Sequence, residues 1–125
     1  ADYPHDPGLP LHGEARSASC GSTLALDLAL DAGGRIERLG MKVHACAVGQ
    51  AAAALFADAA AGRTADDIVR TETAIAIWLA GEGELPDWPG LATIEPARAF
   101  PGRHGAIMLP WRAAAQALSK AGTSR

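Results

Sequence analysis

The sequence predicts an α+β fold in which a small antiparallel sheet of about three strands packs against several helices. Leucine occupies every second position from Leu24 to Leu30, which is typical of a strand with one buried face. From Val48 onward, apolar residues recur at three- and four-residue steps, which is typical of helices. Strands come first and helices afterwards, and this order favours α+β over a parallel α/β sheet.

Length and composition limit the class of protein. The chain has 125 residues, and we expect one domain, residues 1–125, large enough to bury a core. A formal net charge of −3 gives no basic footprint for nucleic acid. No apolar run approaches the roughly 20 residues that a membrane span needs, and the first residues do not resemble a secretory signal. We therefore expect a cytoplasmic protein that binds neither nucleic acid nor membranes.

The first third of the chain predicts the sheet. Three prolines in residues 1–12 indicate an irregular lead-in, and a short strand is expected from Arg16 to Ser19. The leucine strand covers Ser22–Leu30, and Gly33 and Gly34 mark a turn after it. A second clear strand then covers Ile36–Ala45, with Gly40 expected to be a bulge. The simplest arrangement of these strands is an antiparallel meander.

The rest of the chain predicts helices joined by loops. Gly62 is well placed to end the first helix, and Thr64 with Asp67 fits a capping box at the start of the next. Pro110 is tolerable in the last helix only near its first turn. The expected helices cover residues 47–61, 64 to about 70, 73–80 and 105–121, with Ile107, Trp111, Ala114 or Ala115, and Leu118 of the last one facing inward.

Two cysteines indicate where chemistry could occur. Cys20 precedes the leucine strand and Cys46 follows its partner strand, so in a hairpin both lie at one end of the sheet. Cys46 also stands at a strand-to-helix junction, where backbone N–H groups and the helix dipole favour the thiolate that binds metals. The alternative is that each cysteine is a small buried apolar residue.

Two histidines lie close to these cysteines in the expected fold. His44 is two residues before Cys46, so both would project from one face of a strand. His104 stands beside the start of the last helix. Thiolate and imidazole together suit zinc, although a histidine taken alone is more often a surface or capping residue than a metal ligand.

The stretch from Met41 to Thr64 resembles the second cysteine motif of the U-type iron–sulfur cluster assembly scaffolds, the IscU/NifU family. It shows a strand ending in Ala45-Cys46, a helix of small residues and a Gly62-Arg63-Thr64 step. Cys20-Gly21 resembles the first motif of that family, and Phe100-Pro101-Gly102-Arg103 resembles the loop before its third cysteine. The resemblance covers roughly residues 13–121.

The resemblance implies a protein that binds an iron–sulfur cluster, iron or zinc during cluster assembly. Cys20 and Cys46 would be its cluster ligands, and His104 and His44 would be additional metal ligands. It also implies a cysteine desulfurase or other cluster-assembly proteins as partners.

The chain departs from the family pattern at three positions. Ser22 stands where the family has aspartate, Ala106 where it has the third cysteine, and Gly105 where some members have histidine. A two-iron cluster needs four protein ligands. Two thiols per chain can therefore bind one only together with the histidines, or with the thiols of a second copy in a homodimer.

Three functions therefore remain open at this point. The first is a scaffold-like protein that binds metal or cluster through its two cysteines. The second is a degenerate, metal-free homologue that acts as a binding or regulatory module in cluster assembly. The third is an enzyme with Cys46 as nucleophile and His44 or His104 as base. We rank the third last and expect a non-enzyme, because the sequence contains no recognisable oxyanion site or substrate pocket.

Overall fold

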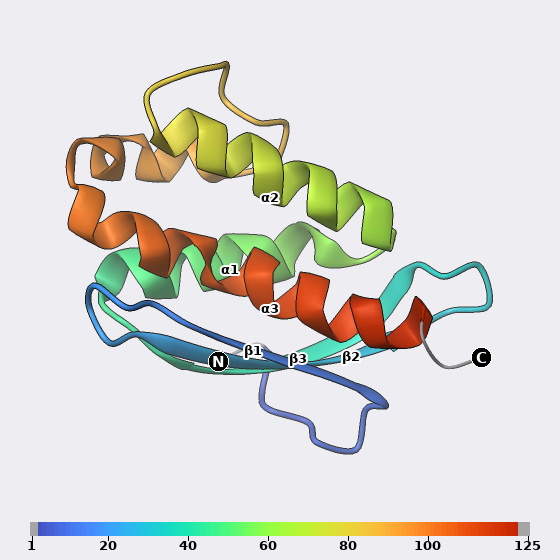
Figure 1. The fold of residues 1–125 in the computed structure, drawn as a ribbon. Coiled ribbons are helices and arrows are strands. Elements are labelled where there is room, and N and C mark those ends of the chain that lie inside the picture. Colours follow the sequence, from blue (N-terminus) through green and yellow to red (C-terminus); the bar gives the residue numbers. More distant parts are fainter. Residues whose placement is uncertain (1–2, 123–125) are drawn as a thin grey trace.

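The computed structural model describes residues 3–122, and it confirms the α+β class (Figure 1). A three-stranded antiparallel sheet forms one layer, and helices cover one of its faces. The elements are β1 (Leu11–Arg16), β2 (Thr23–Leu30), β3 (Ile36–His44), α1 (Ala47–Ala60), α2 (Ala65–Leu79), the 3-10 helices η1 (Leu91–Ala99) and η2 (Pro101–Arg103), and α3 (His104–Gly122). α3 packs on β1 and β2, α1 packs beside it, and α2 lies farthest from the sheet (Figure 1).

The leucine alternation sets the two faces of the sheet. Leu24, Leu26 and Leu28 of β2 are buried against the helices, as predicted. β2 pairs with β3 from Thr23 opposite His44 onward, and the register shifts only near Leu30. The bulge predicted at Gly40 is therefore wrong: Gly40 pairs regularly, and a Cβ at this position would collide with the Pro4 carbonyl.

The first strand lies earlier than the sequence predicted. β1 covers Leu11–Arg16, whereas residues 17–20 form the turn into β2, so the strand expected at 16–19 is wrong. The inward positions of β1 include Gly13 and Ala15, because α3 lies very close: a Cβ at Gly13 would collide with the backbone of Ala113. Small inward residues give no apolar alternation, and this hides the strand in the sequence. The irregular lead-in reaches Pro10.

The start of α2 agrees with the sequence prediction, but its length does not. Thr64 and Asp67 form the predicted capping box, with Thr64 Oγ1 accepting from Asp67 N at 3.1 Å. α2 then runs unbroken to Leu79, where the sequence suggested two shorter helices. Only threonines and a glutamate occupy residues 71–73, and none of these ends a helix as glycine or proline does.

Aromatic rings from three elements fill the centre of the core. The centroids of Phe56, Trp88 and Trp111 lie 5.4 Å from one another in every pair. Trp88 Nε1 donates to the Leu55 carbonyl at 3.0 Å. On α3, Ile107, Trp111, Ala114 and Leu118 are buried, as the sequence predicted. Pro110 lies beyond the first turn of α3, in a helix that contains it without ending.

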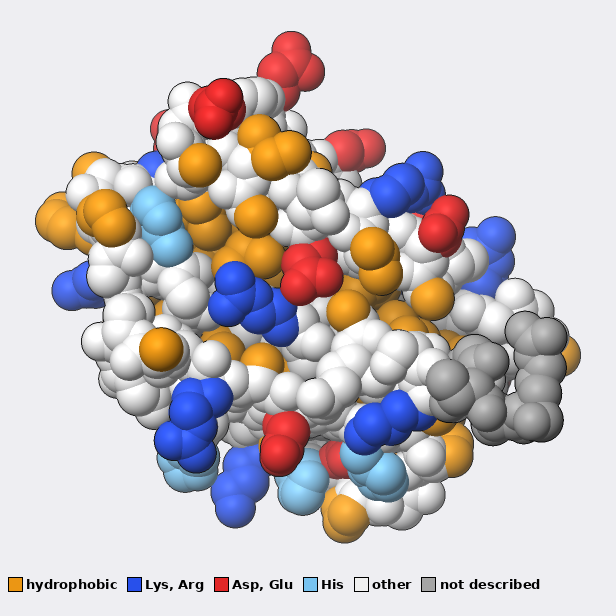
Figure 2. All heavy atoms as spheres, viewed as in Figure 1, with side chains coloured by type: hydrophobic (Ala, Val, Ile, Leu, Met, Phe, Trp, Pro, Cys, Tyr) orange, Lys and Arg blue, Asp and Glu red, His pale blue; other side chains and the backbone are white. Residues whose placement is uncertain are grey.

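Charges are distributed unevenly over the surface. Figure 2 shows acidic side chains over α2 and the loop after it and several histidines over the sheet, with basic side chains in both regions. Within residues 3–122, no helix is both long enough and apolar enough to cross a bilayer.

Candidate functional site

Both cysteine segments leave the sheet at the same end. Thr23, the first residue of β2, pairs with His44, the last residue of β3. Cys20 comes three residues before this pair and Cys46 two residues after it. Both thiols are free and exposed, so neither cysteine is the buried apolar residue that the alternative interpretation required.

Cys20 lies in the tight loop that joins β1 to β2. Ser17 N donates to the Ser22 carbonyl at 2.8 Å, and Gly21, with a φ of 71°, turns the chain back into β2. The Cys20 Sγ lies 3.3 Å from Ser17 Oγ and 3.0 Å from Ser22 Oγ. Two buried serines thus hold an exposed thiol.

These contacts lower the pKa of Cys20 below its ordinary value. The hydrogen bonds of the Ser17 and Ser22 side chains have the largest effect, followed by the backbone of Ser22. Partial desolvation opposes the shift, and the positive charge of Arg103 adds to it. The thiolate is the form that binds metal and attacks electrophiles, so the loop prepares Cys20 for either role.

Cys46 stands at the start of α1, as the change of periodicity predicted. It is the N-cap residue, with φ −64° and ψ 174°, and its carbonyl accepts from Gln50 N at 2.9 Å. Among the residues that the structure describes, no capping hydrogen bond comes from its side chain. The thiol therefore belongs to the residue that precedes the first N–H groups of α1, which have no acceptor within the helix.

The first turn of α3 touches both cysteine segments. A Cβ at Gly105 would lie 2.5 Å from Ser17 Oγ, so the Cys20 loop rests directly on the backbone of this turn. The next residue, Ala106, is fully buried and packs against Gly49 near the start of α1. Ala106, which the resemblance aligns with a third cysteine, thus lies where the two segments approach α3.

The two histidines face other surroundings. His104 Nε2 lies 2.9 Å from the Arg98 carbonyl, and the ring lines a hollow formed by the end of α2, η1 and η2. His44 ends β3 and lines a hollow on the sheet with Arg16, Thr23 and Lys42. β3 ends at His44, and Cys46 is the N-cap residue of α1. Within residues 3–122, no three histidine, cysteine or acidic side chains form a group that could hold a metal ion.

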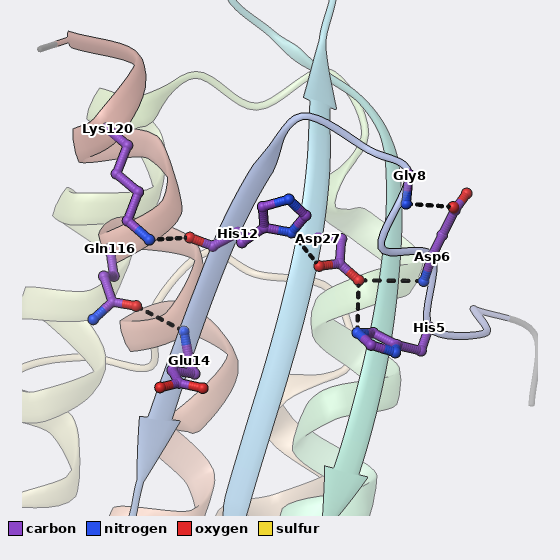
Figure 3. A network of polar contacts seen from close by, with 8 residues as sticks. All are labelled: His5, Asp6, Gly8, His12, Glu14, Asp27, Gln116 and Lys120. Carbon is purple, nitrogen blue, oxygen red and sulfur yellow. Dashed lines mark hydrogen bonds and ion pairs between the residues drawn. The ribbon is translucent and has the colours of Figure 1, made fainter. Parts of the chain in front are cut away.

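A second polar cluster, missed in the sequence, lies on the sheet face that the helices leave open (Figure 3). Asp27 of β2 is only 3% exposed. Its carboxylate lies 2.6 Å from His12 Nδ1 and 3.1 Å from His5 Nε2, and it accepts from Asp6 N at 3.2 Å. The available signal was an aspartate at an outward position of the leucine strand, between two leucines.

The Asp27 cluster fastens the N-terminal segment, residues 3–10, across the sheet. Met41 N donates to the Tyr3 carbonyl at 3.0 Å at the edge of β3, and Tyr3 Oη donates to Asp58 Oδ1 at 3.0 Å. On the other side, Lys120 Nζ donates to the His12 carbonyl at 2.7 Å. Both carboxylate oxygens are contacted by groups of the chain itself, which indicates a structural role.

Comparisons with known proteins agree with this architecture. No protein-family model and no curated protein sequence matches the chain. Among solved structures, the N-terminal part of a nitrogen-fixing NifU-like protein from Brucella abortus superposes with a TM-score of 0.81 at 27% identity, covering 91% of this chain and 80% of that one. A putative iron–sulfur cluster assembly scaffold of the SUF system from Fervidobacterium islandicum gives 0.81 at 20% identity, covering 93% and 85%. The chain therefore has the fold of U-type scaffold proteins, as the resemblance implied.

Proposed function

We propose that the chain is an iron–sulfur cluster assembly scaffold-like protein that holds a metal ion or an iron–sulfur cluster, as its cargo, through Cys20 and Cys46. One observation carries the proposal: the two exposed thiols belong to segments that leave the same end of the sheet, and both segments contact the first turn of α3. The fold supports it, because solved proteins described as NifU-like and as a SUF scaffold share this architecture.

The donor set fits a soft metal and limits how one can be bound. Thiolates select zinc, iron and iron–sulfur clusters over hard cations. Arg103 beside Cys20 offsets part of the negative charge of bound thiolates. One chain offers two sulfur donors, whereas a two-iron cluster takes four ligands. The cargo would thus be shared between two copies, or with ligands of a partner such as a cysteine desulfurase or another cluster-assembly protein in the cytoplasm.

The histidines are secondary ligands in this proposal. His104 would have to release the Arg98 carbonyl, and His44 would have to turn from the sheet surface toward Cys46. His44 is exposed and His104 is half-buried. They would complete a zinc site of mixed sulfur and nitrogen ligands within one chain.

The test is anaerobic reconstitution with ferrous iron and sulfide, and separately a zinc titration, on the parent chain and on Cys20→Ala and Cys46→Ala. Visible absorption, iron and sulfide content and sedimentation are measured together. We expect about one two-iron cluster per two chains, with dimer formation on loading, and loss of both in either variant. Ala18→Ser, which changes an exposed side chain of the same loop, is the matched control and should load normally.

A metal-free binding or regulatory module is the second candidate, and the buried Ala106 favours it. Ala106, which the resemblance aligns with the third cysteine, makes a packing contact with Gly49. If neither metal nor cluster binds under anaerobic conditions, and both cysteine variants remain folded and bind cluster-assembly partners as the parent does, this second function replaces the first.

A further inference from the structure

α2 presents a second apolar face, and this face points away from the rest of the molecule. Its inner face packs mainly on α3 and buries the side chains of Ile68, Ile75, Trp78 and Leu79. Its outer face exposes Val69, Thr73, Ala76, Ile77 and Ala80, and we call this set the outer stripe. Steps of four, three, one and three residues place these side chains on one side of a helix.

The outer stripe carries more apolar surface than a solvent-facing helix needs. Val69 is 48% exposed and Ile77 is 47% exposed, among the few large apolar side chains of the described residues that reach such values. No charged residue occurs between Thr73 and Ala80, although this is the outermost helix. Contiguous exposed apolar surface rimmed by polar residues marks interaction sites in soluble proteins.

The loop after α2 contacts the stripe at Ile77 and carries a further exposed apolar side chain. Glu82 N donates to the Ile77 carbonyl at 3.1 Å, so the chain folds back over the helix end. Gly83 comes so close that a Cβ there would lie 3.2 Å from Ile77 Cγ2. Leu85 follows two residues later and is 44% exposed.

Charge around the stripe indicates which partner fits. Residues 66–87 contain six carboxylates and one arginine, and that arginine, Arg70, pairs with Asp67 at 2.6 Å. Figure 2 shows the acidic side chains beside the apolar ones over α2 and its loop. A symmetric contact between two copies would bring these carboxylates together, and an anionic membrane surface would repel them.

We propose that the outer stripe of α2, with Leu85, docks a basic amphipathic helix of a partner protein. The apolar side of that helix would cover Val69 and Ile77, and its lysines or arginines would face Glu72, Glu82 and Glu84. The proposal goes beyond cluster binding and requires neither cysteine, because the stripe lies on the helix farthest from the sheet.

The probe is a synthetic amphipathic helical peptide of leucine and lysine, compared with a twin in which glutamate replaces lysine. Affinity is measured by titration calorimetry, and the site is mapped by amide chemical shifts of the full chain. The lysine peptide should shift amides within residues 66–85 and bind at least about tenfold more tightly than its twin.

Two variants, each with a control, test the apolar stripe and the carboxylates beside it separately. Ile77→Ser should weaken the lysine peptide about tenfold, whereas Phe100→Ser, at the most exposed large apolar side chain of the described chain, should not. Glu82→Lys with Glu84→Lys should reverse the preference between the peptides, and Glu37→Lys on the sheet should leave it unchanged.

Three results would overturn the proposal. The first is equal binding of both peptides, and the second is amide shifts confined to the sheet or the cysteine end. The third is a dimer in sedimentation that Ile77→Ser returns to monomer, because the occupant of the stripe would then be a second copy of the chain.

Discussion

Two polar regions of the sheet differ in how many of their hydrogen-bonding groups find partners within the chain. At the cysteine end, Cys20 and Cys46 are exposed; the Cys20 thiol is hydrogen-bonded to two serines of its own loop, and Cys46 is the N-cap of α1. On the open face, Asp27 is buried, and groups from β1 and the N-terminal segment bond both of its oxygens. A polar group whose partners are all internal holds the fold together, whereas one left facing solvent keeps capacity for a ligand.

Removing the buried carboxylate should have the largest effect on stability. Asp27→Ala deletes two imidazole contacts and one backbone hydrogen bond, and we expect the free energy of unfolding to fall by about 2 kcal/mol. Urea denaturation measures the loss, and hydrogen exchange at Met41 should accelerate as residues 3–10 detach. Glu37→Ala, at an exposed position of β3, is the control. If Asp27→Ala and the parent were equally stable, the Asp27 cluster would not be what stabilises the fold on the open face.

Stability and cluster loading at the cysteine end should depend on the close packing of the Cys20 loop against the backbone of α3. Gly105→Ala places a Cβ against Ser17 Oγ, and we expect a loss of about 1.5 kcal/mol in unfolding free energy. The loop of Cys20 must move to relieve the contact, so cluster loading should fall as well. Gly102→Ala, where nothing lies within 4 Å of the added atom, should change neither property. Normal loading in Gly105→Ala would mean that the loop need not rest on α3.

Restoring a third thiol should strengthen cargo binding. Ala106→Cys adds a sulfur between the two cysteine segments, and we expect retention of zinc or cluster to improve about tenfold against a competing chelator. The site is fully buried, so the larger side chain should cost about 1 kcal/mol of stability. Ala106→Ser, of similar size but with a weaker ligand, controls for packing. Retention that is the same in all three proteins would place the cargo away from α3.

The smallest effect concerns the reactivity of Cys20. Ser17→Ala removes the hydrogen bond that contributes most to lowering the pKa of Cys20, so this pKa should rise toward its ordinary value. At a fixed pH near 7 less thiolate is present, and alkylation of Cys20 by iodoacetamide should slow several-fold. The pH–rate profile, read by mass spectrometry of the Cys20 peptide, should move to higher pH. A profile identical to that of the parent would show that the serines do not control the thiol.

The sequence predicted the elements whose signals are local. Leucine alternation identified β2, and the hairpin topology placed Cys20 and Cys46 at one end of the sheet. β1 was misplaced because α3 packs so closely that its inward residues are small, and this is a property of the tertiary contact. The surroundings of His104 depend on the Arg98 carbonyl, and the burial of Asp27 depends on a segment some 20 residues earlier. Neither appears in a strand or helix pattern.

The three-ring cluster of Phe56, Trp88 and Trp111 gives the protein an optical reporter. Trp78 is buried as well, so the indole rings are all shielded in the folded chain, where emission is expected at short wavelength. The close, nearly perpendicular placement of Trp88 and Trp111 should couple their transitions and produce a signal in near-ultraviolet circular dichroism. That signal reports the core alone. A variant at the cysteine end that loses its cargo but keeps this spectrum has lost binding without losing its fold.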